Sequence, residues 1–500
     1  MDGTRVRILK EIDVWIRNPE AQRICWITGM AGSGKTSIAK TVCERASTDS
    51  DIMLGGSFFC SRTGVAAQRE IGCVVPTLAQ ILARQSMEYS RALVREIVRD
   101  RDIQHKHVTV QVKQILYTAL LSLQDTSKPV LLVIDALDEC GGETAEIHQA
   151  VSEMLEALVT ALPSSVKLPV KFLVTSRPET HIRDTPVSNA KFSQILRLHT
   201  VNKEEIDADI HRYITATLNA KLSIKPDILV MFTDKMVDDL VRLCDGLFIV
   251  AATALKHTFS SGNDGAEAMF TDLLNASRDS LNEDAVAPLD HMYKVIVEDA
   301  ARKSGTKLPA LLQLLASLLS TRMKLSIAAL ADVLAQSPSR TRSGLARLHA
   351  VVDVPDDDNM PGLRIIHASF GDYMFHRAPV HIRIPRLLGH MTLAHGCLGV
   401  MGRHLRFNIS SSVSSYKPNS STRADSITLS LEYACLHWAH HIAFYKPSDE
   451  ASPNISTLDT VIAQSFRPKF LFWLEVLSVL YKVGLASGLL LIAGSTVSRL

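Results

Sequence analysis

The first 200 residues alternate short apolar runs with longer amphipathic stretches. The runs are continuous and rich in Val, Ile and Leu, which is typical of strands buried on both faces. They lie at 23–28, 53–61, 129–135, 170–176 and 193–198. The stretches with helical spacing lie at 35–47, 68–85, 108–124 and 144–162. This alternation predicts parallel βαβ units, so we expect an α/β domain over 23–200 after a lead-in helix within 1–22.

Helical periodicity dominates the rest of the chain. We expect a helical domain over 201–287, with a break near Asp245 and Gly246. In 288–380, three helical runs precede a hairpin whose turn is "DDDNMPG", a pattern that predicts a winged-helix domain. Those runs lie at 308–320, 325–335 and 339–350. We expect a C-terminal helical region over 381–500, interrupted by a Ser-rich loop at 409–426.

The stretch "GMAGSGKT", Gly29–Thr36, fits the pattern G-x-x-x-x-G-K-[ST] between a predicted strand and a predicted helix. Glycines let such a loop turn its N–H groups toward phosphates, and the following helix adds its dipole. Lys35 supplies a charge for the β- and γ-phosphates, and Thr36 a hydroxyl for Mg²⁺. The predicted nucleotide-binding residues are Gly29, Met30, Ala31, Gly32, Ser33, Gly34, Lys35, Thr36 and Ser37. The alternative is a structural glycine-rich turn.

The predicted fold class is therefore an α/β P-loop NTPase core, a parallel sheet with helices on both faces. A helical domain, a winged-helix domain and a C-terminal helical region follow it.

Three acidic residues follow the predicted strand "VLLVID". Asp135, at the strand end, is expected to hold Mg²⁺ through water, although a strand-end Asp also commonly caps the next element. Glu139 is our first choice and Asp138 our second for the carboxylate that orients an attacking water. At least one of these two is expected to be only a solvated loop acid. With Lys35 they form the predicted catalytic set.

Arg177 ends the next predicted strand, in "VTSRPE". It is expected to lie near the γ-phosphate and to report whether that group is present. A surface arginine before Pro178 is an equally weighted alternative.

Composition adds few constraints on partners. The net charge is only +2, so no overall field favours nucleic acid or membrane, and neither is expected as a partner. The N-terminus has no apolar signal core, and the apolar run at 483–494 is shorter than the roughly 18 residues of a membrane span. Eight scattered cysteines without a CxxC pair favour a reducing compartment, so we expect a cytoplasmic protein.

Together these residues resemble a NACHT-type NTPase of the STAND class, closest to the large NACHT families of mushroom-forming fungi. The resemblance includes "RICWITGMAGSGKTSIAKTVCE", "VLLVIDALDEC" and "FLVTSRPE". It extends to "CDGLFIVAATAL", "PLDHMYKVI", "IIHASFGDYMF", "LEYACLHWAHHI" and "FLFWLEVLSVL", which span most of the chain.

The resemblance implies a signalling switch that binds ATP or ADP with Mg²⁺. Such switches close around ADP, open and oligomerise with ATP, and carry effector and repeat domains, neither of which is visible in this sequence. It also implies that His367, in "IIHASF", contacts the β-phosphate of ADP and latches the closed state. The alternative is that His367 only packs within the hairpin and contacts no ligand. Relatives outside the fungi often carry a Pro after the Gly of the helical-domain motif, whereas Leu247 and Phe248 follow Gly246 here.

Other functions stay open at this point. An AAA-like remodelling ATPase needs an arginine finger, which the sequence does not locate. A winged-helix DNA-binding regulator would use Arg340, Arg342 and Arg347, but three arginines are usually a solvated face, and the acidic hairpin turn would repel DNA. A nucleotide kinase is less favoured again, because no second substrate pocket is apparent.

Overall fold

The chain divides into two compact units, Met1–Leu255 and Lys256–Leu500. The computed structural model describes residues 3–62, 64, 66–124, 128–140, 145–160, 168–188, 193–222, 232–260, 288–303, 307–411, 426–444, 462 and 466–497. Each unit is described below by itself.

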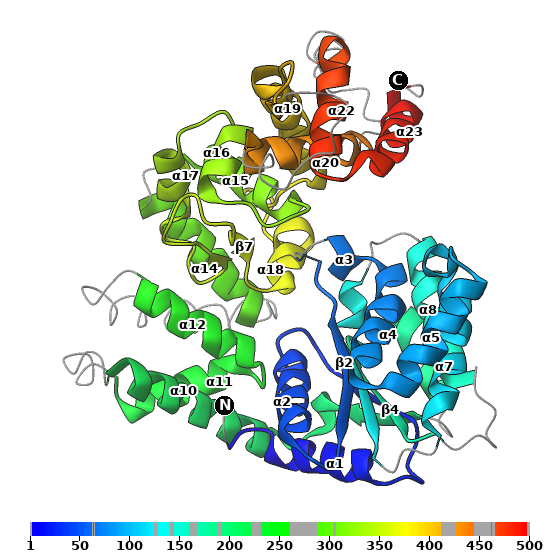
Figure 1. Ribbon diagram of the computed structural model, residues 1–500. Coiled ribbons are helices and arrows are strands. Elements are labelled where there is room, and N and C mark those ends of the chain that lie inside the picture. Colours follow the sequence, from blue (N-terminus) through cyan, green and yellow to red (C-terminus); the bar gives the residue numbers. More distant parts are fainter. Residues whose placement is uncertain are drawn as a thin grey trace. The chain divides into compact units, whose positions relative to one another are not determined.

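A five-stranded parallel sheet forms the centre of the first unit (Figure 1). Its strands are β1 (Ile24–Thr28), β2 (Met53–Phe59), β3 (Val130–Asp135), β4 (Val170–Ser176) and β5 (Ser193–Arg197). The order β2-β3-β4-β1-β5 places β4 between β1 and β3, with Thr28 beside Ser176 and Asp135 beside Phe59. Because all strands are parallel, their carboxyl ends meet at one edge.

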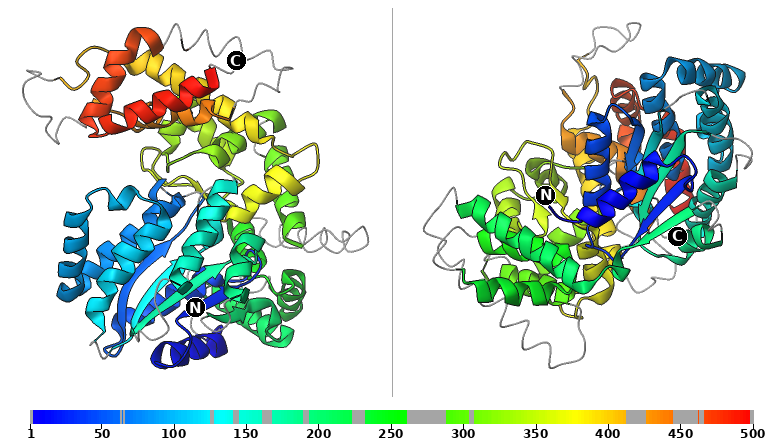
Figure 2. Two further views of the ribbon diagram at one scale, coloured as in Figure 1. Left: turned by 90° about the vertical axis from the view of Figure 1, so that its right-hand side faces the viewer. Right: turned by 90° about the horizontal axis from the view of Figure 1, so that it is seen from below.

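Helices cover both faces of this sheet, which explains why its central strands are continuously apolar. On one face, Trp26, Leu132 and Phe172 pack with α4 (Val74–Gln85), α5 (Met87–Arg99) and α8 (Ala145–Thr160). On the other face, Cys25, Ile27 and their neighbours pack with α1 (Val6–Arg17) and α2 (Lys35–Thr48). Figure 2 shows the same sheet and its covering helices from two further sides. The predicted α/β fold class is confirmed.

Two helical predictions in this unit need correction. The stretch 68–85 is divided into α3 (Ala66–Arg69), a short turn over Ile71–Cys73, and α4. Helix α4 begins at Val74, two residues before Pro76. Proline has no N–H and is tolerated only in the first turn of a helix. The stretch 108–124 forms α6 (Val108–Gln111), a π-helical segment (Val112–Tyr117), α7 (Thr118–Leu120) and a final 3₁₀ turn.

In the described part of this unit, two helices were not predicted. One is α5, whose first turn is capped by the Ser86 hydroxyl, which accepts from the Tyr89 N–H. The other is α9 (Thr180–Ser188), after β4.

Three helices follow the sheet, and the last of them continues past Leu255, where the first unit ends. They are α10 (Lys203–Leu222), α11 (Asp234–Cys244) and α12 (Phe248–Ser260). The predicted break between the last two is present, because Asp245 and Gly246 both have positive φ, 41° and 79°. Residues 261–287 of the predicted helical domain lie outside the described residues.

The second unit contains the predicted helices and hairpin. Helix α14 (Pro288–Lys303) precedes α15 (Leu308–Ser320), α16 (Ile327–Val333) and α17 (Pro338–Leu345). The short strands β6 (Val352–Asp353) and β7 (Arg364–Ile365) pair antiparallel, and α18 (Ala368–Asp372) follows. The first of the three predicted helices has the expected bounds, and the other two are shorter than expected.

Four more helices follow among the described residues of this unit. They are α19 (Arg386–His404), α20 (Leu429–Ile442), α22 (Phe470–Val479) and α23 (Ala486–Val497). Most of the predicted Ser-rich loop, residues 412–425, lies outside the described residues. Across the described ranges, none of the helices combines the length and the apolar character that a membrane crossing needs.

Candidate functional site

The phosphate loop joins the end of β1 to the start of α2, as the sequence predicts. Gly32 and Gly34 have φ values of 77° and 94°, a region that residues with a Cβ rarely adopt. At Gly32 space is also limiting, because an added Cβ would lie 2.0 Å from Cγ2 of Ile249. Ile249 belongs to α12, and its N–H donates to the Gly32 carbonyl at 3.2 Å. Helix α12 therefore packs directly against the loop.

Lys35 bridges the start of this loop. It is the first residue of α2 and is buried, and its Nζ donates to the carbonyls of Gly29 at 2.7 Å and Met30 at 2.9 Å. Burial lowers the pKa of Lys35, and the nearby carboxylates, Asp138 first, oppose that shift. The Met30 side chain itself is exposed, whereas Ser33 is buried.

Asp135 lies at the end of β3 and is 1% exposed. The Thr175 hydroxyl donates to its Oδ1 at 2.6 Å and accepts from the Ala136 N–H at 2.9 Å. Burial raises the pKa of Asp135, while hydrogen bonds from Thr175 and Thr36 oppose the shift. Although β4 separates β3 from β1, Asp135 thus reaches the first turn of α2.

The oxygens at this point suit a magnesium ion. Mg²⁺ is a hard cation that takes few protein ligands, usually one or two carboxylates together with hydroxyl, water and phosphate oxygens. Asp135 and Thr36 supply a carboxylate and a hydroxyl in contact with each other. The residues present therefore fit the ion that the sequence predicts.

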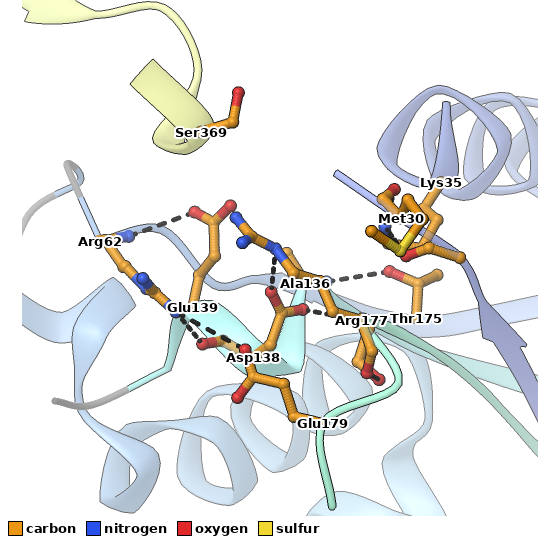
Figure 3. A network of polar contacts seen from close by, with 12 residues as sticks. Met30, Lys35, Arg62, Ala136, Asp138, Glu139, Thr175, Arg177, Glu179 and Ser369 are labelled. Carbon is orange, nitrogen blue, oxygen red and sulfur yellow. Dashed lines mark hydrogen bonds and ion pairs between the residues drawn. The ribbon is translucent and has the colours of Figure 1, made fainter. Parts of the chain in front are cut away.

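Asp138 holds Arg177 by two contacts (Figure 3). Its Oδ1 accepts from the Arg177 backbone N–H at 3.0 Å, and its Oδ2 lies 3.1 Å from Arg177 Nε. The Asp138 side chain is only 3% exposed and that of Arg177 is 21% exposed. Asp138 is therefore not a solvated loop acid, and Arg177 is not a free surface arginine. Of the two acids, of which at least one was expected to be merely solvated, Asp138 is not the solvated one.

Glu139 lies beside this pair, with its carboxylate directed at Arg62. Its Oε2 accepts from the Arg62 backbone N–H at 3.4 Å. The Arg62 guanidinium donates to the Asp138 carbonyl at 3.1 Å and lies 3.9 Å from a Glu179 oxygen (Figure 3). Burial, and then the charge of Asp138, raise the pKa of Glu139 to about 7. Glu139 can therefore exchange a proton near neutral pH.

Three residues of this site were not predicted: Arg62, Thr175 and Glu179. Each lies at or just after the carboxyl end of β2 or β4. Because parallel strands end at one edge, polar residues at those positions carried a usable signal. Arg62 was missed because it belongs to no motif, and Thr175 and Glu179 were not singled out although they lie within "FLVTSRPE".

His367 lies in the second unit, between β7 and α18. Its Nδ1 accepts from the Ser369 backbone N–H at 3.2 Å and lies 2.6 Å from Ser369 Oγ. Ser369 Oγ in turn lies 2.8 Å from the Tyr293 hydroxyl. Since a backbone N–H can only donate, Nδ1 carries a lone pair and the ring proton of the neutral imidazole is on Nε2. The contact between His367 and a nucleotide stays a prediction.

Comparison with known proteins gives one family match. Residues 3–177 match the model of "Nephrocystin 3, N-terminal", a segment that contains the loop, Asp135, Asp138 and Glu139 and ends on Arg177. No curated protein matches the chain.

Three solved structures show a distant likeness. A STAND protein with a tetratricopeptide repeat sensor from Pyrococcus horikoshii is 11% identical over 99% of this chain, with a TM-score of 0.40, and this chain spans 63% of that protein. Cdc6p from Pyrobaculum aerophilum is 12% identical, covering 71% of this chain and 89% of its own, with a TM-score of 0.29. The ORC2 protein from Aeropyrum pernix, in its ADPNP–ADP complexes, is 12% identical, covering 80% and 96%, with a TM-score of 0.30.

Proposed function

We propose that the protein is a nucleotide-gated switch that binds ATP or ADP with Mg²⁺ and hydrolyses ATP slowly. The observation that carries this proposal is the arrangement at one edge of the sheet. Lys35 caps the phosphate loop, Asp135 contacts Thr36, and Glu139 has a pKa of about 7 beside them. Phosphate, metal and water each have a suitable group there.

The proposed chemistry assigns one role to each residue. The loop N–H groups and Lys35 bind the β- and γ-phosphates, while Asp135 and Thr36 hold Mg²⁺. When bound, Mg²⁺ neutralises charge that develops on the phosphate oxygens. Glu139 in its carboxylate form takes the proton of the attacking water, and its pKa near neutrality suits that task.

Slow turnover is supported by the Arg177 contacts. An arginine that stabilises a transferring phosphoryl group must have its guanidinium directed at that group. Here Arg177 Nε is committed to the buried carboxylate of Asp138. Turnover therefore requires the Arg177–Asp138 ion pair to rearrange. Between these rearrangements the protein holds its nucleotide, as a switch does and a metabolic enzyme does not.

We further propose that His367 is the latch that the resemblance implies. Its Nε2–H tautomer, fixed by Ser369, is a donor and suits the β-phosphate of ADP. Release of this contact would let the ATP-bound protein open and form homo-oligomers. The resemblance to fungal NACHT proteins points to innate immunity or self/non-self recognition in the cytoplasm, with effector or repeat domains as protein partners.

One of the three arginines on which the DNA-binding alternative depends is engaged within the protein. Arg342 Nε donates to Asp358 at 2.7 Å, and its Nη2 donates to the carbonyls of Pro355 and Asp356. This arginine fastens α17 to the hairpin turn and is not offered to phosphates. The AAA-like remodelling ATPase remains the second candidate, distinguished by its turnover.

Mass and bound-nucleotide analysis of the purified protein tests the proposal. We expect a monomer that carries ADP and an oligomer with a non-hydrolysable ATP analogue. Fast turnover by a constitutive ring would favour the remodelling ATPase. Wild-type protein that binds neither ADP nor ATP would overturn the proposal.

The latch has its own variant, His367→Ala. We expect faster ADP release and more oligomer, because one phosphate contact is lost. His381→Ala is the matched control, since His381 is exposed and pairs with Glu298. An unchanged ADP release rate in His367→Ala would remove His367 from the site without affecting the phosphate loop.

A further inference from the structure

A series of three hydrogen-bonding side chains runs through the second unit from α14 to His367. The Tyr293 hydroxyl lies 2.8 Å from Ser369 Oγ, which lies 2.6 Å from His367 Nδ1. Tyr293 and Ser369 are 1% and 2% exposed, whereas His367 is half-buried. Tyr293, Ser369 and His367 thus form a hydrogen-bond relay that leads from a buried tyrosine to the imidazole of the proposed latch.

The backbone fixes the direction of the hydrogen bonds in this relay. The Ser369 N–H donates to His367 Nδ1 at 3.2 Å, so Nδ1 carries a lone pair and no proton. The Ser369 hydroxyl lies closer to the same nitrogen and must therefore donate to it as well. Its oxygen accepts from Tyr293, so each hydroxyl donates one step toward the imidazole. Burial raises the pKa of Tyr293, which therefore stays protonated as the first donor.

Helix capping explains only part of this arrangement. His367 is the N-cap of α18, and its contact with the Ser369 N–H is a capping hydrogen bond. A cap of this kind needs neither the Ser369 hydroxyl nor Tyr293. Buried hydroxyls cost free energy unless they are hydrogen-bonded, and the relay satisfies both of them by ending on Nδ1. The same contacts hold the imidazole ring in one orientation and leave its proton on Nε2.

The Tyr293 ring is held in place by its surroundings. It packs edge-on against Phe370, with ring centroids 5.1 Å apart. Helix α14 is also tied to the segment after α18, because both carboxylate oxygens of Asp290 accept from Arg377, at 2.7 and 2.9 Å. The start of the relay is therefore fixed relative to its end.

A second tyrosine in the same cluster lacks the hydrogen bond. The Tyr373 ring centroid lies 5.5 Å from that of Tyr293, and Tyr373 is also 1% exposed. Its hydroxyl has no hydrogen-bond partner in the part of the chain that the structure describes. The two tyrosines therefore share their packing and differ in hydrogen bonding.

We propose that Tyr293 and Ser369 are positioning residues for the His367 latch, which they hold in one orientation with its proton on Nε2. This rests on the proposed latch and adds two residues that act through His367. Without the Tyr293 hydroxyl, Ser369 Oγ can accept from a proton on Nδ1, so the second tautomer becomes populated. That tautomer has a lone pair on Nε2, which repels a phosphate oxygen instead of donating to it.

Tyr293→Phe and Tyr373→Phe form a matched pair of variants. Each removes one hydroxyl from the same aromatic cluster, but only the first interrupts the relay. We expect ADP release from purified Tyr293→Phe to be about three- to tenfold faster than from wild type, the loss expected for one neutral hydrogen bond. Tyr373→Phe should release ADP at the wild-type rate.

Nitrogen NMR of nucleotide-free protein with isotope-labelled histidine reports the tautomer directly. The signals of His367 are those that disappear in His367→Ala. We expect the single Nε2–H tautomer in wild type and in Tyr373→Phe, and signals averaged between two tautomers in Tyr293→Phe. Ser369→Ala should show the same averaging, and it replaces Tyr293→Phe if that variant does not fold.

Three outcomes would overturn the positioning role. They are wild-type ADP release in Tyr293→Phe, faster release with an unchanged tautomer, and equal changes in Tyr293→Phe and Tyr373→Phe, which would mean that packing sets the effect. Failure of the latch itself has a different signature, because His367→Ala would then leave ADP release unchanged. In that case the NMR result alone decides whether the relay sets the tautomer.

Discussion

Two arginines flank the phosphate loop in opposite environments. Arg177 is partly exposed, and its Nε is paired with the Asp138 carboxylate at 3.1 Å. Arg5 is more deeply buried, and Nε and Nη1 of its guanidinium are without acceptors within the described ranges. Both arginines contact residues at or near the loop. The guanidinium of Arg177 forms an ion pair with Asp138, whereas that of Arg5 donates to the Ser33 carbonyl and has Asp209 and Glu205 as its charged neighbours.

The difference shows how each arginine can respond to a nucleotide. A paired arginine is held until its carboxylate partner releases it, so Arg177 is suited to a conformational step. Arg5 fastens the loop to α10, because its side chain donates to the Ser33 carbonyl and its backbone N–H donates to Asp209. The proposed turnover therefore belongs to the Arg177 side of the loop, whereas the Arg5 side positions the loop.

Lys35→Ala should affect both sides at once and have the largest effect. Removing the ammonium takes away the charge that faces the phosphates, and we expect nucleotide affinity to fall at least about 100-fold. Calorimetry with ADP measures it, and Lys40→Ala, on an exposed face of the same helix, is the control. Bound ADP in purified Lys35→Ala would contradict the assignment of the loop.

Glu139→Gln should act on the Arg177 side alone. We expect ATP hydrolysis to fall by a factor of about 10²–10⁴, the usual contribution of a general base, while nucleotide affinity stays near wild type. In the wild type, the rate should rise with pH up to about 7 and level off above, because only the carboxylate form accepts a proton. Glu146→Gln, an exposed change on α8, should alter neither property. A Glu139→Gln variant that hydrolyses ATP normally would exclude Glu139 as the base.

Much of the first unit follows from sequence because its signals are local. The runs around Trp26 and Leu132 are continuously apolar since helices cover both faces, and each predicted a strand correctly. Helix α5 was missed although Ser86 caps it and its buried residues Tyr89, Ala92 and Leu93 follow helical spacing, so a usable signal was present there.

The site residues likewise divide into those that the sequence locates and those that only the fold brings together. Gly34, Lys35 and Asp135 belong to motifs with fixed spacing, so the sequence located them. Arg62 and Arg5 act through the tertiary fold: Arg62 reaches Glu139 across 77 positions, and the Arg5 backbone reaches Asp209 across 204. No spacing rule connects such residues, and the deep burial of Arg5 is visible only once the sheet and α12 are in place.

Asp138→Asn tests whether Asp138 controls the Arg177 side. Asparagine keeps the shape and can still accept from the Arg177 N–H, but it loses the ion pair to Nε. Because the Asp138 charge helps to raise the pKa of Glu139, its removal should lower that pKa. The midpoint of the pH–rate profile should therefore fall below that of wild type, and the rate at pH 6 should rise by a factor of a few, at most about tenfold. An unchanged midpoint would show that Asp138 does not act on Glu139.

The smallest expected effect is that of Glu139→Gln on the stability of the fold. The variant should lose activity but gain stability. The folded-state pKa of Glu139 is raised from 4.5 to about 7 because burial disfavours the charged carboxylate. Ionised Glu139 therefore destabilises the fold by an amount that grows as pH rises from 4.5 through 7 and is constant above. Glu139→Gln should raise the free energy of unfolding of nucleotide-free protein at pH 8 by roughly 1–3 kcal/mol, with little change at pH 5. Denaturant melts at both pH values measure the difference. Equal effects at pH 5 and pH 8 would mean that packing, not ionisation, sets it, and a destabilised variant at pH 8 would contradict the raised pKa. The expected result is a base whose burial opposes folding at the pH where it makes hydrolysis possible.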